Sequence, residues 1–106
     1  MNEEKILVGQ QYVTPIGRID ILAKDKKGKE WLVIELKKGK NSDQVVGQIL
    51  RYITWVKENE ASDGELVKGI IITREHDEKL KYAVRAVADV DLMTYSVNFT
   101  LRKVEK

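Results

Sequence analysis

The chain has no cysteine and only one proline, one histidine and one phenylalanine among its 106 residues. Without cysteine it can form neither a disulfide nor a thiolate metal site, and a single histidine excludes a metal site built mainly from imidazoles. The N-terminus lacks the apolar core of a signal peptide, and no apolar run approaches the roughly 20 residues that span a membrane. These absences favour a cytoplasmic protein.

The chain also has no large excess of charge of either sign. Lysines and arginines exceed acidic residues by only two, although 34% of the residues are charged. Any affinity for nucleic acid must therefore come from a local basic patch and not from bulk charge. The chain is 42% hydrophobic, which is enough to build a core. Its length predicts a single domain spanning residues 1–106.

Hydrophobic periodicity predicts an α/β protein in which a mixed sheet is flanked by helices. The expected order is β-β-β-α-β-α-β-β. Asn41 or Ser42 is placed to cap the first helix, and His76 to cap the second. The expected strands are residues 6–14, 18–24, 30–38, 66–74, 90–97 and 99–104, and the expected helices are residues 43–59 and 76–89.

Two carboxylates stand inside otherwise apolar strand patterns, Asp20 in Gly17-Arg18-Ile19-Asp20 and Glu35 in Ile34-Glu35-Leu36-Lys37. A hairpin loop centred on Lys27-Gly28 pairs the two strands so that Asp20 lies opposite Glu35. Paired residues of antiparallel strands have Cβ atoms about 4.5–5.5 Å apart. The hairpin geometry therefore predicts that the two carboxylates meet.

Two adjacent carboxylates repel unless a cation lies between them, and a hard divalent cation takes oxygen ligands of this kind. Mg²⁺ is the natural candidate because it binds one or two carboxylates and accepts a phosphate oxygen, and Mn²⁺ is able to substitute. Lys37, on the same strand face as Glu35, is placed to orient the attacking water or to offset charge on a phosphate. The alternative is that these are solvated charges at the open end of a sheet.

The first expected helix carries a polar stripe in which Gln44, Gln48 and Tyr52 recur every four residues beside the apolar arc. Gln48 and Tyr52 can hydrogen-bond a catalytic carboxylate or a phosphate, although a polar helix flank with a packed tyrosine gives the same pattern. Four basic residues near the expected site are candidate DNA phosphate contacts or ordinary surface charges: Arg18, Lys38, Lys40 and Arg51.

These residues together resemble the PD-(D/E)XK, or restriction-endonuclease-like, nuclease superfamily. Asp20 followed by Glu35-Leu36-Lys37 is similar to its acidic motif, and Gln48 with Tyr52 is similar to the Q-x-x-x-Y motif of the RecB-like branch. The wider string that includes Gln11-Tyr12 and the GRID sequence is similar to the nuclease domain of NucS-type endonucleases.

The resemblance implies a DNA endonuclease that depends on a divalent cation and has a restriction-endonuclease-like fold. It implies that Asp20 and Glu35 are metal ligands, that Lys37 is the catalytic lysine, and that Gln48 and Tyr52 support the site. Relatives usually begin with a helix that carries an acidic residue ahead of the first strand, and we expect this helix to be absent or very short here. A sheet face left uncovered in this way favours a homodimer.

Two rival functions remain open at this point. The fold can serve as a non-catalytic nucleic-acid-binding or assembly module, which the expected loss of the front helix favours. A nuclease that acts on RNA is a third possibility. The complete set of Asp20, Glu35 and Lys37 favours the DNA endonuclease.

Overall fold

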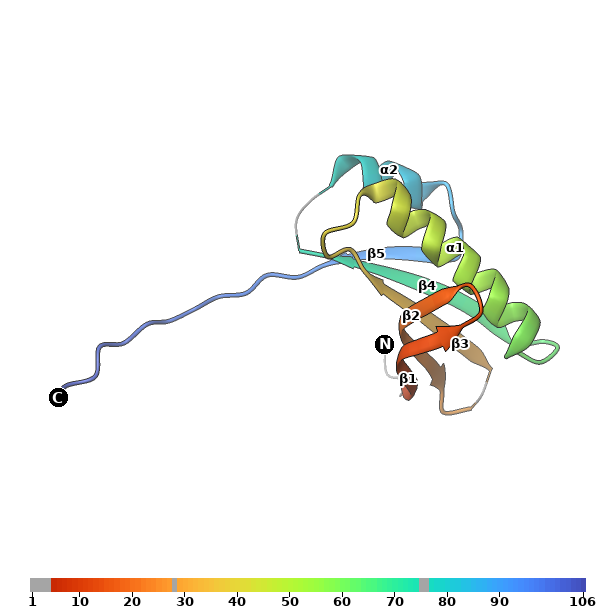
Figure 1. Ribbon diagram of the computed structural model, residues 1–106, viewed down its shortest axis with the longest axis horizontal. Coiled ribbons are helices and arrows are strands. Elements are labelled where there is room, and N and C mark those ends of the chain that lie inside the picture. Colours follow the sequence, from red (N-terminus) through yellow and green to blue (C-terminus); the bar gives the residue numbers. More distant parts are fainter. Residues whose placement is uncertain (1–4, 28, 75–76) are drawn as a thin grey trace.

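A computed structural model describes residues 5–27, 29–74 and 77–106 and contains one five-stranded sheet and two helices (Figure 1). The strands stand side by side in sequence order. Pairing is antiparallel from β1 to β3 and parallel from β3 to β5, which confirms the expected mixed sheet. The elements are β1 (Lys5–Thr14), β2 (Gly17–Asp25), β3 (Glu30–Leu36), α1 (Ser42–Asn59), β4 (Leu66–Thr73), α2 (Glu78–Arg85) and β5 (Val90–Thr94).

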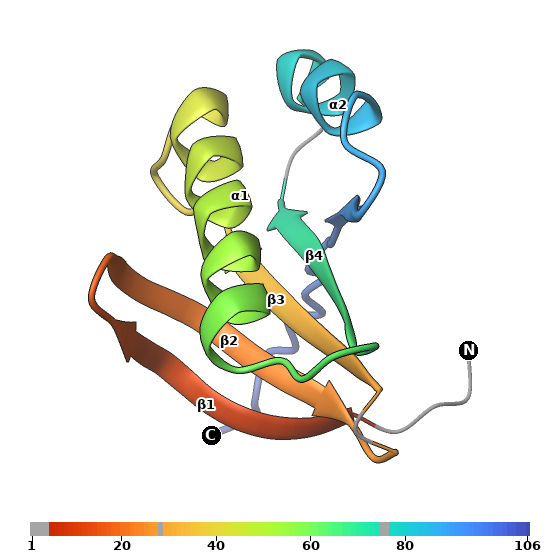
Figure 2. The same ribbon diagram turned by 90° about the vertical axis from the view of Figure 1, so that its right-hand side faces the viewer.

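Both helices lie on the same face of the sheet, with α1 over β3 and β4 and α2 next to it over β5 (Figure 2). Burial alternates along β3, where Trp31, Val33 and Glu35 are buried and the residues between them are partly exposed. This is the period of a strand that has one covered face. Gly69 of β4 lets α1 approach closely, because a Cβ there would lie 2.8 Å from the Cδ1 atom of Ile49.

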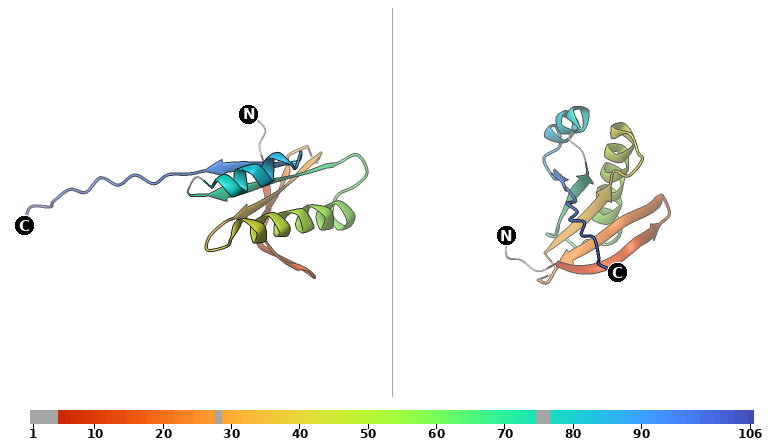
Figure 3. Two further views of the ribbon diagram at one scale, coloured as in Figure 1. Left: turned by 90° about the horizontal axis from the view of Figure 1, so that it is seen from above. Right: turned by 90° about the vertical axis from the view of Figure 1, so that its left-hand side faces the viewer.

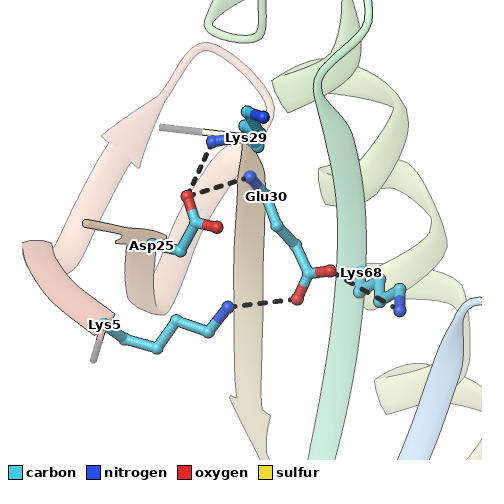
Figure 4. A network of polar contacts seen from close by, with 5 residues as sticks. All are labelled: Lys5, Asp25, Lys29, Glu30 and Lys68. Carbon is cyan, nitrogen blue, oxygen red and sulfur yellow. Dashed lines mark hydrogen bonds and ion pairs between the residues drawn. The ribbon is translucent and has the colours of Figure 1, made fainter. Parts of the chain in front are cut away.

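The β2–β3 hairpin has the register expected from the sequence, since Ile21 pairs with Ile34 and Lys24 with Trp31. Asp25 closes its loop (Figure 4): Oδ1 accepts hydrogen bonds from the backbone N–H groups of Lys29, at 2.6 Å, and Glu30, at 3.2 Å. The Glu30 carboxylate in turn contacts the ammonium groups of Lys5 and Lys68. A loop fixed at its base holds the register that aligns β2 with β3.

Both helices begin at side-chain caps. Asn41 caps α1, and the Gln44 side chain accepts a hydrogen bond from the Asn41 backbone, which completes a capping box. The Gln44 side chain therefore caps the N-terminus of α1, a role that Gln48 and Tyr52 do not share. Asp77 caps α2, which is shorter at both ends than the helix expected over residues 76–89. The expected cap, His76, lies outside the described residues.

The expected last strand over residues 99–104 does not form. After β5 ends at Thr94 the chain continues as an extended segment that leaves the body of the domain (Figures 1 and 3). A strand needs a neighbour for its backbone hydrogen bonds, and this segment has none within the described chain. The expectation about an N-terminal helix concerns residues 1–4, which lie outside the described part.

No helix in the described part of the chain is both long and apolar enough to cross a membrane.

Candidate active site

Asp20 and Glu35 meet directly beyond the last paired residues of β2 and β3. The backbone N–H of Asp20 donates to Glu35 Oε2 at 2.8 Å, and the backbone N–H of Leu36 donates to Asp20 Oδ2 at 2.8 Å. Each carboxylate thus takes the place of a carbonyl from the opposite strand. One oxygen of each carboxylate is held in position, and Asp20 Oδ1 and Glu35 Oε1 are left for other partners.

Burial along β2 does not alternate strictly in the stretch that contains Asp20. Ile19 and Leu22 are three residues apart, yet both are fully buried, so strict two-residue alternation does not hold between them. On the neighbouring strand Gln11 has a φ of 49°, an unusual conformation for a non-glycine residue. The Gln11 side-chain amide lies 3.4 Å from Asp20 Oδ1. Gln11 thus adds a side-chain contact to the Asp20 oxygen that the backbone of β3 leaves available.

Glu35 is a carboxylate with no exposed surface. Burial raises its pKa to about 7; the hydrogen bond from the Asp20 backbone opposes this rise, the Asp20 charge adds to it, and Lys40 lowers it. Glu35 Oε1 and Gln48 Oε1 are the buried side-chain oxygens without a hydrogen-bond partner in the described part of the chain. The Lys40 ammonium lies 3.9 Å from Glu35 Oε1. Buried acceptors without partners are rare in folded proteins and often mark a functional site.

Tyr52 of α1 is buried and close to both carboxylates. Its pKa is raised, first by burial, then by the charge of Glu35 and, less strongly, by Asp20, while Arg51 lowers it. Helix α1 therefore brings Tyr52 to the sheet beside the acidic pair. Gln48, one turn earlier, contributes the second buried oxygen.

Gly17 fixes how closely Tyr52 approaches the β1–β2 turn. Gly17 has a φ of +136°, and a Cβ at this position would lie 2.4 Å from the Tyr52 hydroxyl oxygen. The next nearest atom, Cζ of the Tyr52 ring, would lie 3.3 Å away. A side chain here would be strained and would also displace the tyrosine.

We expect Gly17→Ala to destabilise the fold by about 1–3 kcal/mol, from the contact with Tyr52 and the unfavourable φ. The double variant Gly17→Ala/Tyr52→Phe should recover part of this loss, because it removes the closest atom. Urea unfolding of the two single variants and the double variant measures the coupling. If the loss of stability in the double variant equals the sum of the losses in the two single variants, the contact between position 17 and the Tyr52 hydroxyl is contradicted.

The predicted catalytic lysine takes a different partner. The Lys37 ammonium lies 3.3 Å from Asp77 Oδ2, the cap of α2, and the same oxygen accepts a hydrogen bond from the Ser42 hydroxyl at 2.9 Å. These contacts and the Leu80 amide lower the pKa of Asp77, and the amide contributes most. Lys40, expected to contact DNA, is the cation beside Glu35.

The remaining predicted basic residues are exposed on three different segments. Arg18 and Arg51 are exposed on β2 and α1, and Lys38 is exposed in the loop after β3. A cavity of about 320 Å³ at the ends of β3 and β4 is lined by Lys37 and Lys38 together with Leu36, Gly39, Ile72, Thr73, Arg74 and Tyr95. Three cations around one cavity provide a local basic patch in a chain whose overall charge is nearly balanced.

Sequence reasoning missed two side chains of this neighbourhood. Gln11 was noted only as part of a longer string, and its positive φ leaves no mark in the sequence. Asp77 stands directly before an apolar helical pattern and is a better N-cap type than His76, so its identity was a usable signal. Its contact with Lys37 depends on where α2 packs and is not encoded locally.

The donor set fits a hard divalent cation. Asp20 and Glu35 each have one oxygen held by a backbone N–H and one oriented for another partner, and Glu35 Oε1 lacks a hydrogen bond. Carboxylate oxygens held by such hydrogen bonds are typical metal ligands. Within the described ranges no three acidic or imidazole side chains form a cluster that could hold a metal. Water and a phosphate would complete the ligand shell of a cation such as Mg²⁺.

Comparison with known proteins places this domain in a family. Residues 1–95 match the family model described as the endonuclease NucS C-terminal domain. The chain belongs to this family. Over 65 residues it is 40% identical to endonuclease NucS of Sulfolobus acidocaldarius, and over 66 residues it is 36% identical to endonuclease NucS of Methanocaldococcus jannaschii. These alignments cover 61% and 62% of the chain.

The fold also has a solved counterpart. The crystal structure of a repair endonuclease from Pyrococcus abyssi superimposes with a TM-score of 0.70 and 26% sequence identity over 89% of this chain and 39% of that one. The chain spans only about a quarter of the length of the NucS proteins it matches, 24% in both cases. The family and the mixed α/β fold are thereby established for this NucS C-terminal domain.

Proposed function

We propose that this NucS-family domain is the catalytic domain of a PD-(D/E)XK-type DNA endonuclease that hydrolyses phosphodiester bonds with the help of Mg²⁺. One observation carries the proposal: Asp20 and Glu35 are fixed by each other's strand, and Glu35 Oε1 is buried without a hydrogen bond. A buried carboxylate oxygen in this state is costly unless it serves a cation or a proton.

When bound, Mg²⁺ supplies a Lewis acid for the phosphate and lowers the pKa of a water molecule that attacks it. Asp20 and Glu35 would hold the cation through Oδ1 and Oε1, the oxygens that their backbone contacts leave available. Tyr52 is buried beside the pair, and Gln48 places a buried amide oxygen one turn earlier on the same helix. Asp20 and Glu35 would thus offer a cation two preoriented oxygens and would lose little side-chain conformational entropy on binding it.

Two lysines compete for the role of the catalytic cation. By resemblance Lys37 would neutralise charge on the phosphate, and its place beside Lys38 and Arg74 at the cavity supports a phosphate contact. Lys40 lies nearer to the acidic pair, at 3.9 Å from Glu35 Oε1. We assign Lys37 to the phosphate and Lys40 to balancing the charge of Glu35 while no cation is bound.

A homodimer completes this proposal. Two copies related by a two-fold axis would hold two sites at a fixed separation, which suits cleavage of both strands of a duplex. The covering of only one sheet face by α1 and α2 supports such an assembly (Figure 2).

Cleavage assays test the proposed activity. We expect the chain to cut DNA in Mg²⁺ or Mn²⁺ and to leave it intact in EDTA, with duplex, single-stranded, flap and mismatched substrates compared in parallel. An equal amount of RNA serves as the control for substrate class. Cleavage that persists in EDTA would refute the metal-dependent mechanism. Binding of DNA without cleavage in any metal would favour the non-catalytic binding module.

A further inference from the structure

We infer that residues 95–101 form a dimerisation arm that packs against the open sheet face of a second copy. The open face is the side of the sheet turned away from α1 and α2. This inference rests on the homodimer proposed above and assigns its contact surfaces. The arm begins where β5 ends and leaves the domain as an extended segment (Figure 1).

The arm has the sequence pattern of a strand with one apolar side. Four large apolar side chains alternate with Ser96, Asn98 and Thr100. The apolar residues are exposed over much of their surface, at 50% for Tyr95, 49% for Val97, 81% for Phe99 and 93% for Leu101. A monomer rarely exposes apolar side chains in a continuous row of this kind, so the row is typical of an interface.

The open face carries apolar side chains of matching character, with the charged residues Lys68 of β4 and Asp91 of β5 beside them. Along β4 the buried residues Val67, Gly69 and Ile71 face the helices, so Ile70 and Ile72 lie on the opposite side. Both are only partly buried there. The same alternation puts Met93 of β5, which is 53% exposed, on the open face. Further members are Leu32, Ile34 and Leu36 of β3.

The arm cannot readily reach the open face of its own chain. Returning to it requires a tight reversal directly after β5, and no glycine or proline follows Gly69 in the sequence. These residues are the usual means of making such reversals. The arm instead extends outward, and the molecule measures 62 Å along its longest axis against 32 and 28 Å across (Figure 3).

A second copy is the occupant that this geometry favours. In a two-fold dimer each chain donates one arm and receives one, so both exposed surfaces are covered by the same contact. The match to the NucS C-terminal domain covers residues 1–95, so most of the arm lies beyond the matched range.

Light scattering at micromolar concentration tests the arm. We expect wild-type protein to have twice the chain mass of 12.2 kDa. Phe99→Asp/Leu101→Asp should give a monomer, because both charges fall on the apolar side of the arm. The matched control is Asn98→Asp/Thr100→Asp, which adds the same two charges on the polar side and should remain dimeric. Circular dichroism checks that each variant is folded.

A mixing experiment tests the receiving surface. Met93→Asp alters the open face at an already exposed position and should weaken the dimer. Mixed with Phe99→Asp/Leu101→Asp protein, it should form a heterodimer, since one chain still has an arm and the other an intact open face. Absence of heterodimer while both proteins are folded would overturn the pairing of arm and face.

The outcomes separate the inference from the proposed function. A wild-type monomer would overturn both the arm and the homodimer. A dimer that survives Phe99→Asp/Leu101→Asp would overturn the arm and leave the homodimer standing. None of these measurements involves DNA or a cation, so the cleavage assays judge the endonuclease separately.

Discussion

Replacing Glu35 with glutamine is expected to lower the rate of metal-dependent DNA cleavage by more than about 100-fold. Mutating a residue that only hydrogen-bonds a metal ligand already lowers metal affinity or activity by about 10–100-fold, and Glu35 would be a ligand itself. Glutamine keeps an oxygen that can accept the hydrogen bond from the Asp20 backbone, so the hairpin should stay intact. What it removes is the charge that would hold the cation. The loss should therefore appear in cleavage and not in folding.

The measurement is an initial cleavage rate over a range of Mn²⁺ concentrations, beside circular dichroism and urea unfolding. Glu58→Gln is the matched control, because Glu58 is an exposed glutamate of α1 that makes no contribution to the site. Asp20→Asn should behave like Glu35→Gln. A Glu35→Gln protein with wild-type activity would show that the acidic pair is not the catalytic centre.

Metal-free protein is expected to lose stability as the pH rises from 5 to 8. The pKa of Glu35 is raised from 4.5 to about 7 in the folded state, mainly by burial. Between these values the folded chain binds more protons than the unfolded chain, so the free energy of unfolding falls as pH increases. The stabilisation is fully present below pH 4.5 and is lost as the pH passes through 7. A shift of this size corresponds to about 3 kcal/mol.

Urea unfolding in EDTA at several pH values between 5 and 8 measures this slope. Glu35→Gln should flatten the curve, and comparison with it cancels contributions from the single histidine, which titrates in both proteins. Added Mn²⁺ should stabilise wild-type protein more at pH 8 than at pH 6, since the cation binds the ionised carboxylate. Equal slopes for wild type and Glu35→Gln would contradict the raised pKa.

The hairpin and its register were open to prediction from the sequence because the information is local. A short loop at Lys27-Gly28 and the two-residue side-chain period allow few pairings, and the expected one is observed. The start of α1 at Asn41 and the approach of Tyr52 to the sheet follow equally from local patterns. The order of the first seven elements was likewise predictable from periodicity alone.

The expected strand over residues 99–104 shows the limit of such patterns. Its alternation indicates which side of the segment is apolar, but pairing requires a neighbouring strand that the chain does not place there. An alternating pattern indicates that one side of a segment tends to be buried, but it does not determine which part of the structure covers that side. The same pattern that predicted a sixth strand is what makes the arm suited to a second copy.

The sequence by itself determined that two acidic strands pair in register, with a helix bearing Gln48 and Tyr52 beside them. Only the tertiary structure decided how each carboxylate is held, through the unusual backbone of Gln11 and hydrogen bonds between strands. The tertiary structure also decided that Lys37 forms an ion pair with Asp77 and that the Lys40 ammonium lies close to Glu35. Ion pairs join residues far apart in the chain or extend from loops, so packing fixes them and local propensity does not.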